Sequence, residues 1–186
     1  MTIDEERDAF HRALGLAIAR WANVEVALRN VFLASLGVYT PDDPRALSIA
    51  DPAAAAFFSV MSFRGKLTMT TAAIRVSFGN GEVSRGWDNL LKRLKLDGRR
   101  SLKRNDLAHF SVSYNEELAP GRRYMLTKTP WNPTNLRLYS RNDSPIYHLE
   151  DLLTAENEFA EISREFGIFA ARAQQQKRPR RSSPGG

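Results

Sequence analysis

The chain has 186 residues, contains no cysteine and carries a formal net charge of +6 at pH 7. A chain of this length can bury one substantial hydrophobic core, and the lack of cysteine excludes disulfides and thiolate metal sites. It has no apolar run near the ~20 residues that a membrane-spanning helix needs, and its first residues are acidic where a signal peptide is basic. We therefore expect a soluble cytoplasmic protein with one domain over residues 1–173 and a disordered basic tail over residues 174–186.

Helical periodicity dominates the first half of the chain. Apolar residues recur at three- and four-residue steps from residue 4 to about residue 37, and Gly37 is predicted to stop this first helix. After a loop rich in proline, a second helix is predicted over residues 53–78, and a third, with Ser84 as its N-cap, to about residue 96. The second helix is so broadly apolar that we expect part of it to meet a second subunit.

A basic band follows over residues 85–104. We expect the third helix to break at Asp97-Gly98 and a further helical segment to run from Arg99 to about Val112. A band of this kind can neutralise the phosphates of a nucleic acid, and the alternative is a solvated helix face. Eight cations make up the band: Arg85, Lys92, Arg93, Lys95, Arg99, Arg100, Lys103 and Arg104.

The pattern becomes extended after this segment and then helical again. Two β-prone runs on either side of residues 130–133 predict a hairpin over about residues 122–140. Trp131 in its turn either stacks on a base or packs on its own hairpin. A last amphipathic helix is predicted over residues 149–174. The fold class that follows is all-α, a bundle of four to five helices with a small β-hairpin inserted before the last one.

The residues best suited to chemistry form the string Arg104-Asn105-x-x-x-His109. On a helix, Asn105 and His109 lie one turn apart on the same face, and Arg104 lies on the flank of that face. An imidazole can give or take a proton at neutral pH, and a guanidinium is a fixed cation shaped for phosphate oxygens. That combination suits phosphodiester chemistry. The structural alternative is an imidazole bonded to nearby backbone and an arginine paired with Asp97 or Asp106.

Other chemistries lack the residues that they need. The three histidines, His11, His109 and His148, are scattered along the chain, so a zinc or di-metal site is hard to build. No phosphate-binding Gly-x-x-x-x-Gly-Lys-Ser/Thr loop and no Gly-x-Ser-x-Gly motif is present. Nor is helix-turn-helix spacing evident, which disfavours a plain DNA-binding protein. We expect neither a metal nor a cofactor.

The string Arg-Asn-x-x-x-His on a helix resembles the signature of the HEPN superfamily. Leu107-Ala108 before the histidine, the pattern from Trp21 to Glu25 on a long first helix and the closing amphipathic helix extend the resemblance over most of residues 4–173. It implies a metal-independent endoribonuclease, in which the ribose 2′-hydroxyl attacks the adjacent phosphorus and leaves a 2′,3′-cyclic phosphate. His109 would act as general acid or base, Arg104 would stabilise the charge on the phosphorane oxygens, and Asn105 would hold the imidazole or the phosphate.

The resemblance also implies supporting residues. Glu25 could orient His109 or Arg104, as acidic residues on the first helix often do in that family, and Asp106 is a second candidate for support. The alternative for Glu25 is an exposed i,i+4 salt bridge with Arg29. The residues expected to bind RNA are Arg99, Arg100 and Lys103.

Partners follow from the same resemblance. HEPN proteins commonly form homodimers in which two Arg/His pairs face one cleft, so we expect RNA and a second copy of the chain as partners. A toxin or antiphage role, with an antitoxin or regulatory protein, is implied as well. In some toxins of the family the antitoxin modifies a tyrosine two residues after the histidine; Ser111 stands there and departs from that pattern. The alternative function is a non-catalytic HEPN-like module that binds RNA, a nucleotide or a regulatory partner.

Overall fold

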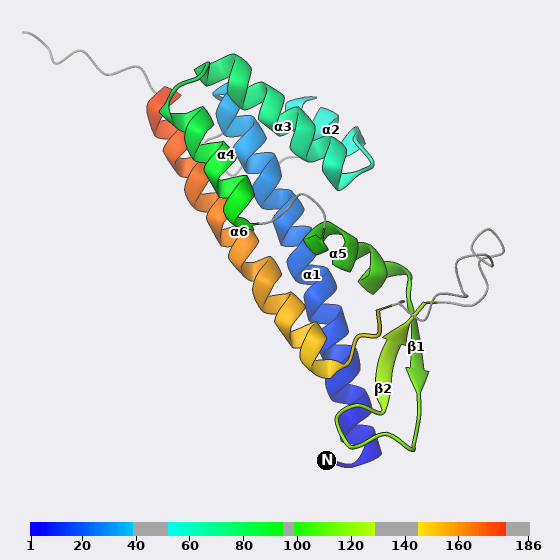
Figure 1. Cartoon of the computed structure of the whole chain (residues 1–186). Coiled ribbons are helices and arrows are strands. Elements are labelled where there is room, and N and C mark those ends of the chain that lie inside the picture. The colour runs from blue at the N-terminus through cyan, green and yellow to red at the C-terminus, as the bar shows by residue number, and fades with distance from the viewer. Residues whose placement is uncertain (39–51, 95–98, 129–144, 178–186) are drawn as a thin grey trace, which may run out of the picture. The chain divides into compact units, whose positions relative to one another are not determined.

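The computed structural model describes residues 1–38, 52–94, 99–128 and 145–177, with the backbone alone for residues 99–102 (Figure 1). This part of the chain is mostly helical, which confirms the expected all-α class. It contains six helices and one two-stranded antiparallel sheet. In chain order the elements are α1 (Ile3–Leu36), α2 (Pro52–Ser59), α3 (Phe63–Phe78), α4 (Glu82–Leu94), α5 (Arg99–His109), β1 (Ser111–Tyr114), β2 (Tyr124–Thr127) and α6 (Leu149–Lys177).

The chain divides into two compact units. Unit 1 comprises residues 1–22 and 96–160, and unit 2 comprises residues 23–95 and 161–186. Each unit therefore contains one part of α1 and one part of α6, because the divisions fall inside these two long helices. The hairpin and α5 belong to unit 1, whereas α2, α3 and α4 belong to unit 2.

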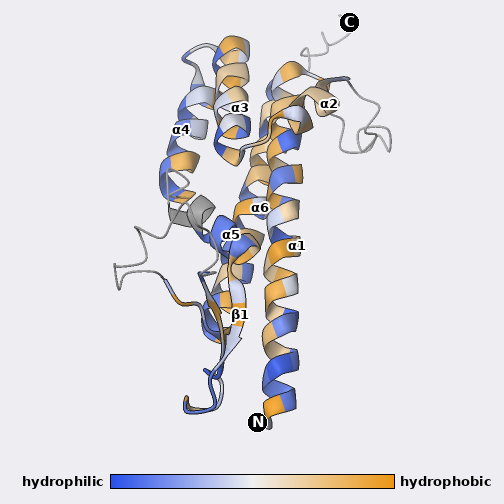
Figure 2. Cartoon of the chain, turned by 90° about the vertical axis from the view of Figure 1, so that its right-hand side faces the viewer, coloured by the Kyte–Doolittle hydropathy of each residue, from blue (hydrophilic) through white to orange (hydrophobic). Residues whose placement is uncertain are grey.

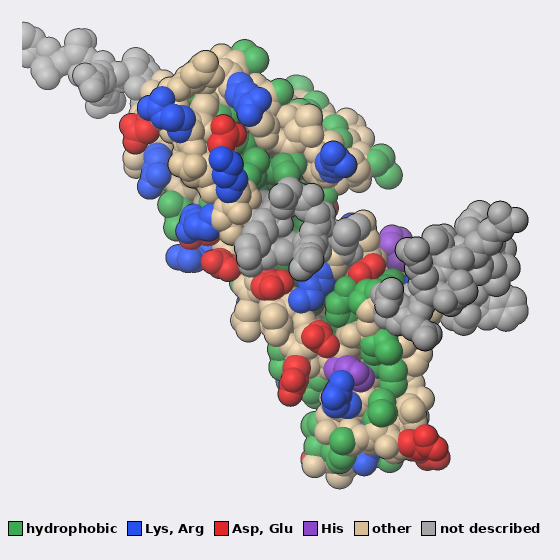
Figure 3. Space-filling model, in the orientation of Figure 1, with side chains coloured by type: hydrophobic (Ala, Val, Ile, Leu, Met, Phe, Trp, Pro, Cys, Tyr) green, Lys and Arg blue, Asp and Glu red, His purple; other side chains and the backbone are tan. Residues whose placement is uncertain are grey.

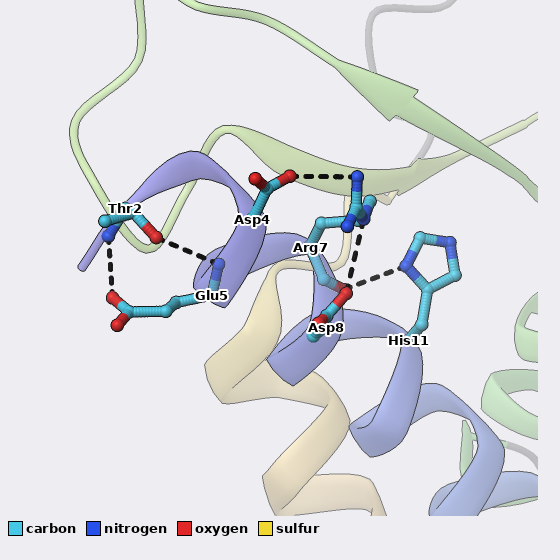
Figure 4. A network of polar contacts seen from close by, with 6 residues as sticks. All are labelled: Thr2, Asp4, Glu5, Arg7, Asp8 and His11. Carbon is cyan, nitrogen blue, oxygen red and sulfur yellow. Dashed lines mark hydrogen bonds and ion pairs between the residues drawn. The ribbon is translucent and has the colours of Figure 1, made fainter.

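A capping box fixes the start of α1 in unit 1. The Glu5 amide donates to Thr2 Oγ1 at 3.2 Å, and the Thr2 amide donates to Glu5 Oε2 at 2.8 Å. These reciprocal bonds satisfy two backbone donors that have no partner within the helix, so the helix begins at Ile3. Figure 4 shows this pair beside the ion pair that Arg7 forms with Asp4 at 3.0 Å.

The end of α1 confirms the predicted stop at Gly37. The Gly37 amide donates to the Ala34 carbonyl, and the Val38 amide donates to the Leu33 carbonyl, both at 3.1 Å. This is the Schellman pattern, which requires a residue in the left-handed region after the last helical residue. Gly37 supplies it with a φ of 78°. Figure 2 shows hydrophobic and hydrophilic residues alternating along α1, as expected of an amphipathic helix.

The single helix predicted over residues 53–78 is wrong, because two helices occupy this stretch. Ser62 is extended and caps α3, and its Oγ accepts a hydrogen bond from the Gly65 amide at 3.0 Å. A Cβ at Gly65, in the first turn of α3, would lie 2.8 Å from Cγ1 of Val60, so glycine at this position allows the close approach of Val60. The break explains why the described chain has more helices than the four to five expected.

The predicted N-cap of α4 is also wrong. The helix begins at Glu82, and Ser84 lies inside its first turn, where the Ser84 hydroxyl donates to the Gly79 carbonyl at 2.5 Å. A serine in the first turn can satisfy a nearby backbone acceptor, so its presence near a helix start does not identify the cap position. The helix ends at Leu94. The break predicted at Asp97-Gly98 lies outside the described residues.

The hairpin pairs a different strand from the one predicted. β2 confirms the strand character of residues 124–127, but its partner is β1, with Ser111 opposite Thr127 and Tyr114 opposite Tyr124. The helix predicted to run to about Val112 is shorter, because α5 ends at His109. The period-two sequence of β1, with a β-branched and an aromatic residue, suits a strand. The other predicted strand and Trp131 lie outside the described residues.

The core of unit 1 gathers around aromatic side chains of α1 and α6. The rings of Trp21 and Phe159 pack edge to face with centroids 5.0 Å apart. Buried Glu6 fixes the hairpin to α1, because the Arg123 amide donates to its Oε1 at 2.8 Å and the Arg123 guanidinium lies 3.6 Å from its Oε2. The other fully buried side chains of this core include Phe10, Ala17, Leu126 and Leu152.

The core of unit 2 is centred on Trp87 of α4. Its ring lies 5.6 Å from that of Phe166 and 5.1 Å from that of Phe169, both on α6. The indole N–H donates to Thr71 Oγ1 at 2.9 Å, so this buried donor is satisfied. α6 extends through residues 174–177, which were expected to belong to the tail, and Lys177 Nζ donates to Ser77 Oγ at 3.2 Å.

Candidate functional site

The motif residues lie together on the C-terminal turns of α5 in unit 1. Asn105 and His109 are exposed, and Arg104 is half-buried beside them. Buried Leu107 fixes which side of the helix faces the core. The order of exposed and buried positions matches the helical arrangement predicted from the sequence, with Asn105 and His109 on one outward face.

A hydrogen bond links the first two residues of the motif. Arg104 Nη1 donates to Asn105 Oδ1 at 3.1 Å. Because adjacent residues on a helix point about 100° apart, this bond draws the guanidinium towards the outward face that Asn105 shares with His109. Arg104 and Asn105 can therefore present a cation and an amide to the same ligand.

Asp106 points to a different partner. The Tyr147 hydroxyl donates to Asp106 Oδ2 at 2.6 Å, across 41 residues of sequence. The alternative that pairs Arg104 with Asp106 is therefore not realised: within the described residues Arg104 forms no ion pair with an acid. The other acid considered, Asp97, lies outside these residues. Burial of the Tyr147 hydroxyl and its hydrogen bond to Asp106 raise the pKa of Tyr147 above its ordinary value.

Tyr147 was not identified from the sequence. Its backbone pairs with that of Leu126 in both directions, at 2.9 and 3.2 Å, which places it beside β2. Its ring lies 5.9 Å from that of Phe110, the residue that follows α5. No local pattern marks such a residue, because its partners lie far away in the chain. A tyrosine just ahead of an amphipathic helix is the only signal that was present.

Of the three residues expected to bind RNA, the structure describes the side chain of Lys103 alone. Lys103 is half-buried on α5, and its Nζ lies 3.6 Å from Glu158 Oε2 on α6. Its charge is therefore partly balanced within unit 1. Arg99 and Arg100 lie in the first turn of α5, where only the backbone is described.

Three further residues of the basic band, Arg85, Lys92 and Arg93, lie on α4 in unit 2, whereas Lys95 lies outside the described residues. Arg93 forms an ion pair with Glu165 of α6, and Arg85 donates to the Asn80 carbonyl at 3.0 Å. Figure 3 shows basic and acidic side chains interspersed on the face of unit 2 that carries α4. For the described part of α4 these observations favour the alternative of a solvated helix face with mixed charges.

Glu25 belongs to unit 2 and has a partner there. Lys66 Nζ lies 2.5 Å from Glu25 Oε2, and the Lys66 side chain is buried. The ammonium also lies 5.6 Å from the ring centroid of Phe57. The alternative was an exposed pair of Glu25 with Arg29, and the expected exposure is wrong. Arg29 is buried, and its guanidinium donates to the neighbouring Asn30. A supporting role for Glu25 at the motif stays a prediction.

The three histidines lie on different elements. His11 is exposed on α1 with its Nδ1 2.8 Å from the Arg7 carbonyl oxygen, and His148 stands immediately before α6. His109 is the last residue of α5. Among the residues that the structure describes, no group of three or more His, Cys, Asp or Glu side chains is placed to hold a metal ion.

No helix in the described ranges has both the length and the apolar character needed to cross a membrane. Comparisons with family models, with curated proteins and with solved structures find no match to the chain. The resemblance to the HEPN superfamily therefore depends on the motif of α5 and on the helical architecture that carries it.

Proposed function

We propose that the chain is a metal-independent endoribonuclease of the HEPN type. One observation supports this most directly: Arg104, Asn105 and His109 lie within the last turns of one helix, with Asn105 and His109 on its outward face and Arg104 bonded to Asn105. A cation, an amide and an imidazole are thereby offered to the same ligand. These are the groups that phosphodiester transfer needs when the nucleophile comes from the substrate.

The ribose 2′-hydroxyl would be that nucleophile. A new bond forms between O2′ and phosphorus, the bond from phosphorus to O5′ breaks, and a 2′,3′-cyclic phosphate remains. One imidazole takes the proton of the 2′-hydroxyl, and a proton must be given to the leaving O5′. In the homodimer that the resemblance implies, His109 of each protomer supplies one of these two transfers.

Arg104 would act on the charge that builds up during this step. The phosphodiester carries one negative charge and gains a second as the phosphorane forms, and a guanidinium that is already oriented stabilises this added charge without further reorganisation. Asn105 fixes the guanidinium through its Oδ1, so it contributes to that orientation. DNA has no 2′-hydroxyl and should not be cut.

The decisive experiment compares two histidine substitutions. Purified wild type, His109→Ala and His11→Ala are incubated with cellular RNA in excess EDTA, and the ends of the fragments are identified. We expect wild type and His11→Ala to give 2′,3′-cyclic phosphate ends, and His109→Ala to be at least ~100-fold slower, since general acid-base catalysis contributes about 10²–10⁴. His11 is a matched control because it is also exposed and lies on another helix.

Two results would contradict the proposal. If His109→Ala cuts RNA as fast as wild type, the activity comes from a contaminating nuclease. If RNA stays intact with wild type, the chain is not an endoribonuclease that acts on its own. Intact RNA that nevertheless binds to the protein would support the alternative, a non-catalytic binding or regulatory module on the same face of α5. A toxin or defence role predicts in addition that expression of wild type, and not of His109→Ala, arrests growth.

A further inference from the structure

We infer that Tyr147 is a positioning residue that acts through Asp106 to set the direction in which Arg104, Asn105 and His109 face. The inference rests on the proposed function, since it concerns how that site is held. Its starting point is the hydrogen bond from the Tyr147 hydroxyl to Asp106 Oδ2, which is 2.6 Å long and partly buried. A short bond to a carboxylate is stronger than one between neutral groups.

α5 needs an external anchor. It has only 11 residues, and no acidic residue stands in its first turn. Helices of this length are marginal on their own in water, so contacts with the rest of unit 1 must fix the rotation of α5 about its axis. The contacts of α5 include buried Leu107, the ion pair of Lys103 with Glu158 at 3.6 Å and the hydrogen bond from Tyr147. Of the two polar contacts, the hydrogen bond from Tyr147, at 2.6 Å, is shorter than the ion pair of Lys103.

Tyr147 is itself fixed on both sides. Its amide donates to the Leu126 carbonyl at 3.2 Å and its carbonyl accepts from the Leu126 amide at 2.9 Å. The next residue, His148, immediately precedes α6, and its amide donates to Asp151 Oδ2 at 2.8 Å. The hydroxyl therefore belongs to a rigid junction of β2 and α6 and can transmit that rigidity to Asp106.

The position of Asp106 makes this anchor relevant to the motif. It follows Asn105 directly and lies one turn before the end of the helix at His109. Rotation of the helix about its axis would therefore move Asp106 and the motif side chains together. A misplacement of about 1 Å at reacting groups can cost about 10²-fold in rate. A tyrosine hydroxyl is protonated, and so a donor, at neutral pH, and the raised pKa of Tyr147 extends this range to higher pH.

The test uses Tyr147→Phe, which removes the hydroxyl and keeps the ring against Phe110. We expect kcat for RNA cleavage to fall by about tenfold with little change in KM, because one charge-assisted hydrogen bond is lost and the phosphate-binding groups remain. Tyr114→Phe is the matched control: Tyr114 lies on β1, is exposed, and should tolerate the same change. The double variant Asp106→Ala/Tyr147→Phe should be no slower than Asp106→Ala alone.

A second readout does not depend on activity. Amide hydrogen exchange of residues 105–109 should be faster in Tyr147→Phe than in wild type or Tyr114→Phe, while exchange in α3 and α4 stays unchanged. Asp106→Asn keeps an acceptor oxygen and should retain most of the protection and the activity. This rescue by a conservative variant distinguishes an acceptor that positions the helix from a charge that acts on the substrate.

The outcomes separate the two proposals. If wild type cuts RNA and Tyr147→Phe keeps both its kcat and its exchange rates, the positioning role is wrong. It is also wrong if Asp106→Asn loses as much activity as Asp106→Ala, since the charge would then act directly. If wild type does not cut RNA, the proposed function fails, and the exchange rates alone decide whether Tyr147 anchors α5.

Discussion

The ion pair of Glu25 with Lys66 allows a prediction at the scale of single residues. Both side chains are largely removed from solvent, so Glu25→Gln leaves a buried ammonium without its carboxylate. We expect the free energy of unfolding to fall by about 3 kcal/mol, the usual cost of breaking a buried pair. The double variant Glu25→Gln/Lys66→Met should recover part of this loss in urea denaturation. A double variant as unstable as the sum of the single variants would show that the two side chains do not interact.

The sequence could identify residues whose relations are local. Arg104, Asn105 and His109 lie within five positions of one another, so helical geometry alone places Asn105 and His109 on one face. The partners of Glu25 and of Asp106 could not be found in this way. Lys66 and Tyr147 each lie 41 residues from the acid that they contact, and only the fold brings them there. The i,i+4 rule instead suggested Arg29, which is buried beside Asn30.

At the scale of elements, a glycine inside α1 and the glycine immediately after it should respond to alanine in opposite ways. Gly37 has a φ of 78°, where a Cβ is strained, so Gly37→Ala should lower the free energy of unfolding by about 1 kcal/mol. Gly15 is exposed inside the same helix, and a Cβ there would meet no atom within 4 Å. Gly15→Ala should therefore raise the free energy of unfolding by about 0.5–1 kcal/mol. Urea denaturation of both variants measures the difference; shifts of the same sign would contradict this account of the helix end.

The long helices were predictable because their apolar periodicity extends over many turns. α1 and α6 have nearly the predicted bounds. Boundaries between short elements were harder, since apolar residues recur over the whole of residues 53–78 and neither proline nor an Asn-Gly pair marks the break before α3. β1 has only four residues and begins two residues after the end of α5. A run this short does not give a clear period of two, so the helix was predicted to continue to Val112.

At the scale of the whole molecule, the two-unit division was not visible in the sequence. α1 and α6 each contribute to both units, and their periodicity continues without interruption across the division. Cores built around separate aromatic clusters, Trp21 with Phe159 and Trp87 with Phe166, become apparent only when the partner helices are placed. The all-α class, in contrast, follows from the proportion of helical patterns and needs no such placement.

The expected homodimer leads to a last prediction. Val76 on α3 is 88% exposed, so a second subunit could cover this apolar side chain. If the broad apolar surface of α3 meets a second subunit, wild type should sediment as a two-chain species. Val76→Asp should shift it to a single chain, because burying an unpaired carboxylate in an apolar interface is costly. Thr68→Asp, at an exposed polar position of the same helix, should leave the two-chain species intact. Sedimentation of Val76→Asp as a dimer would exclude this face as the interface.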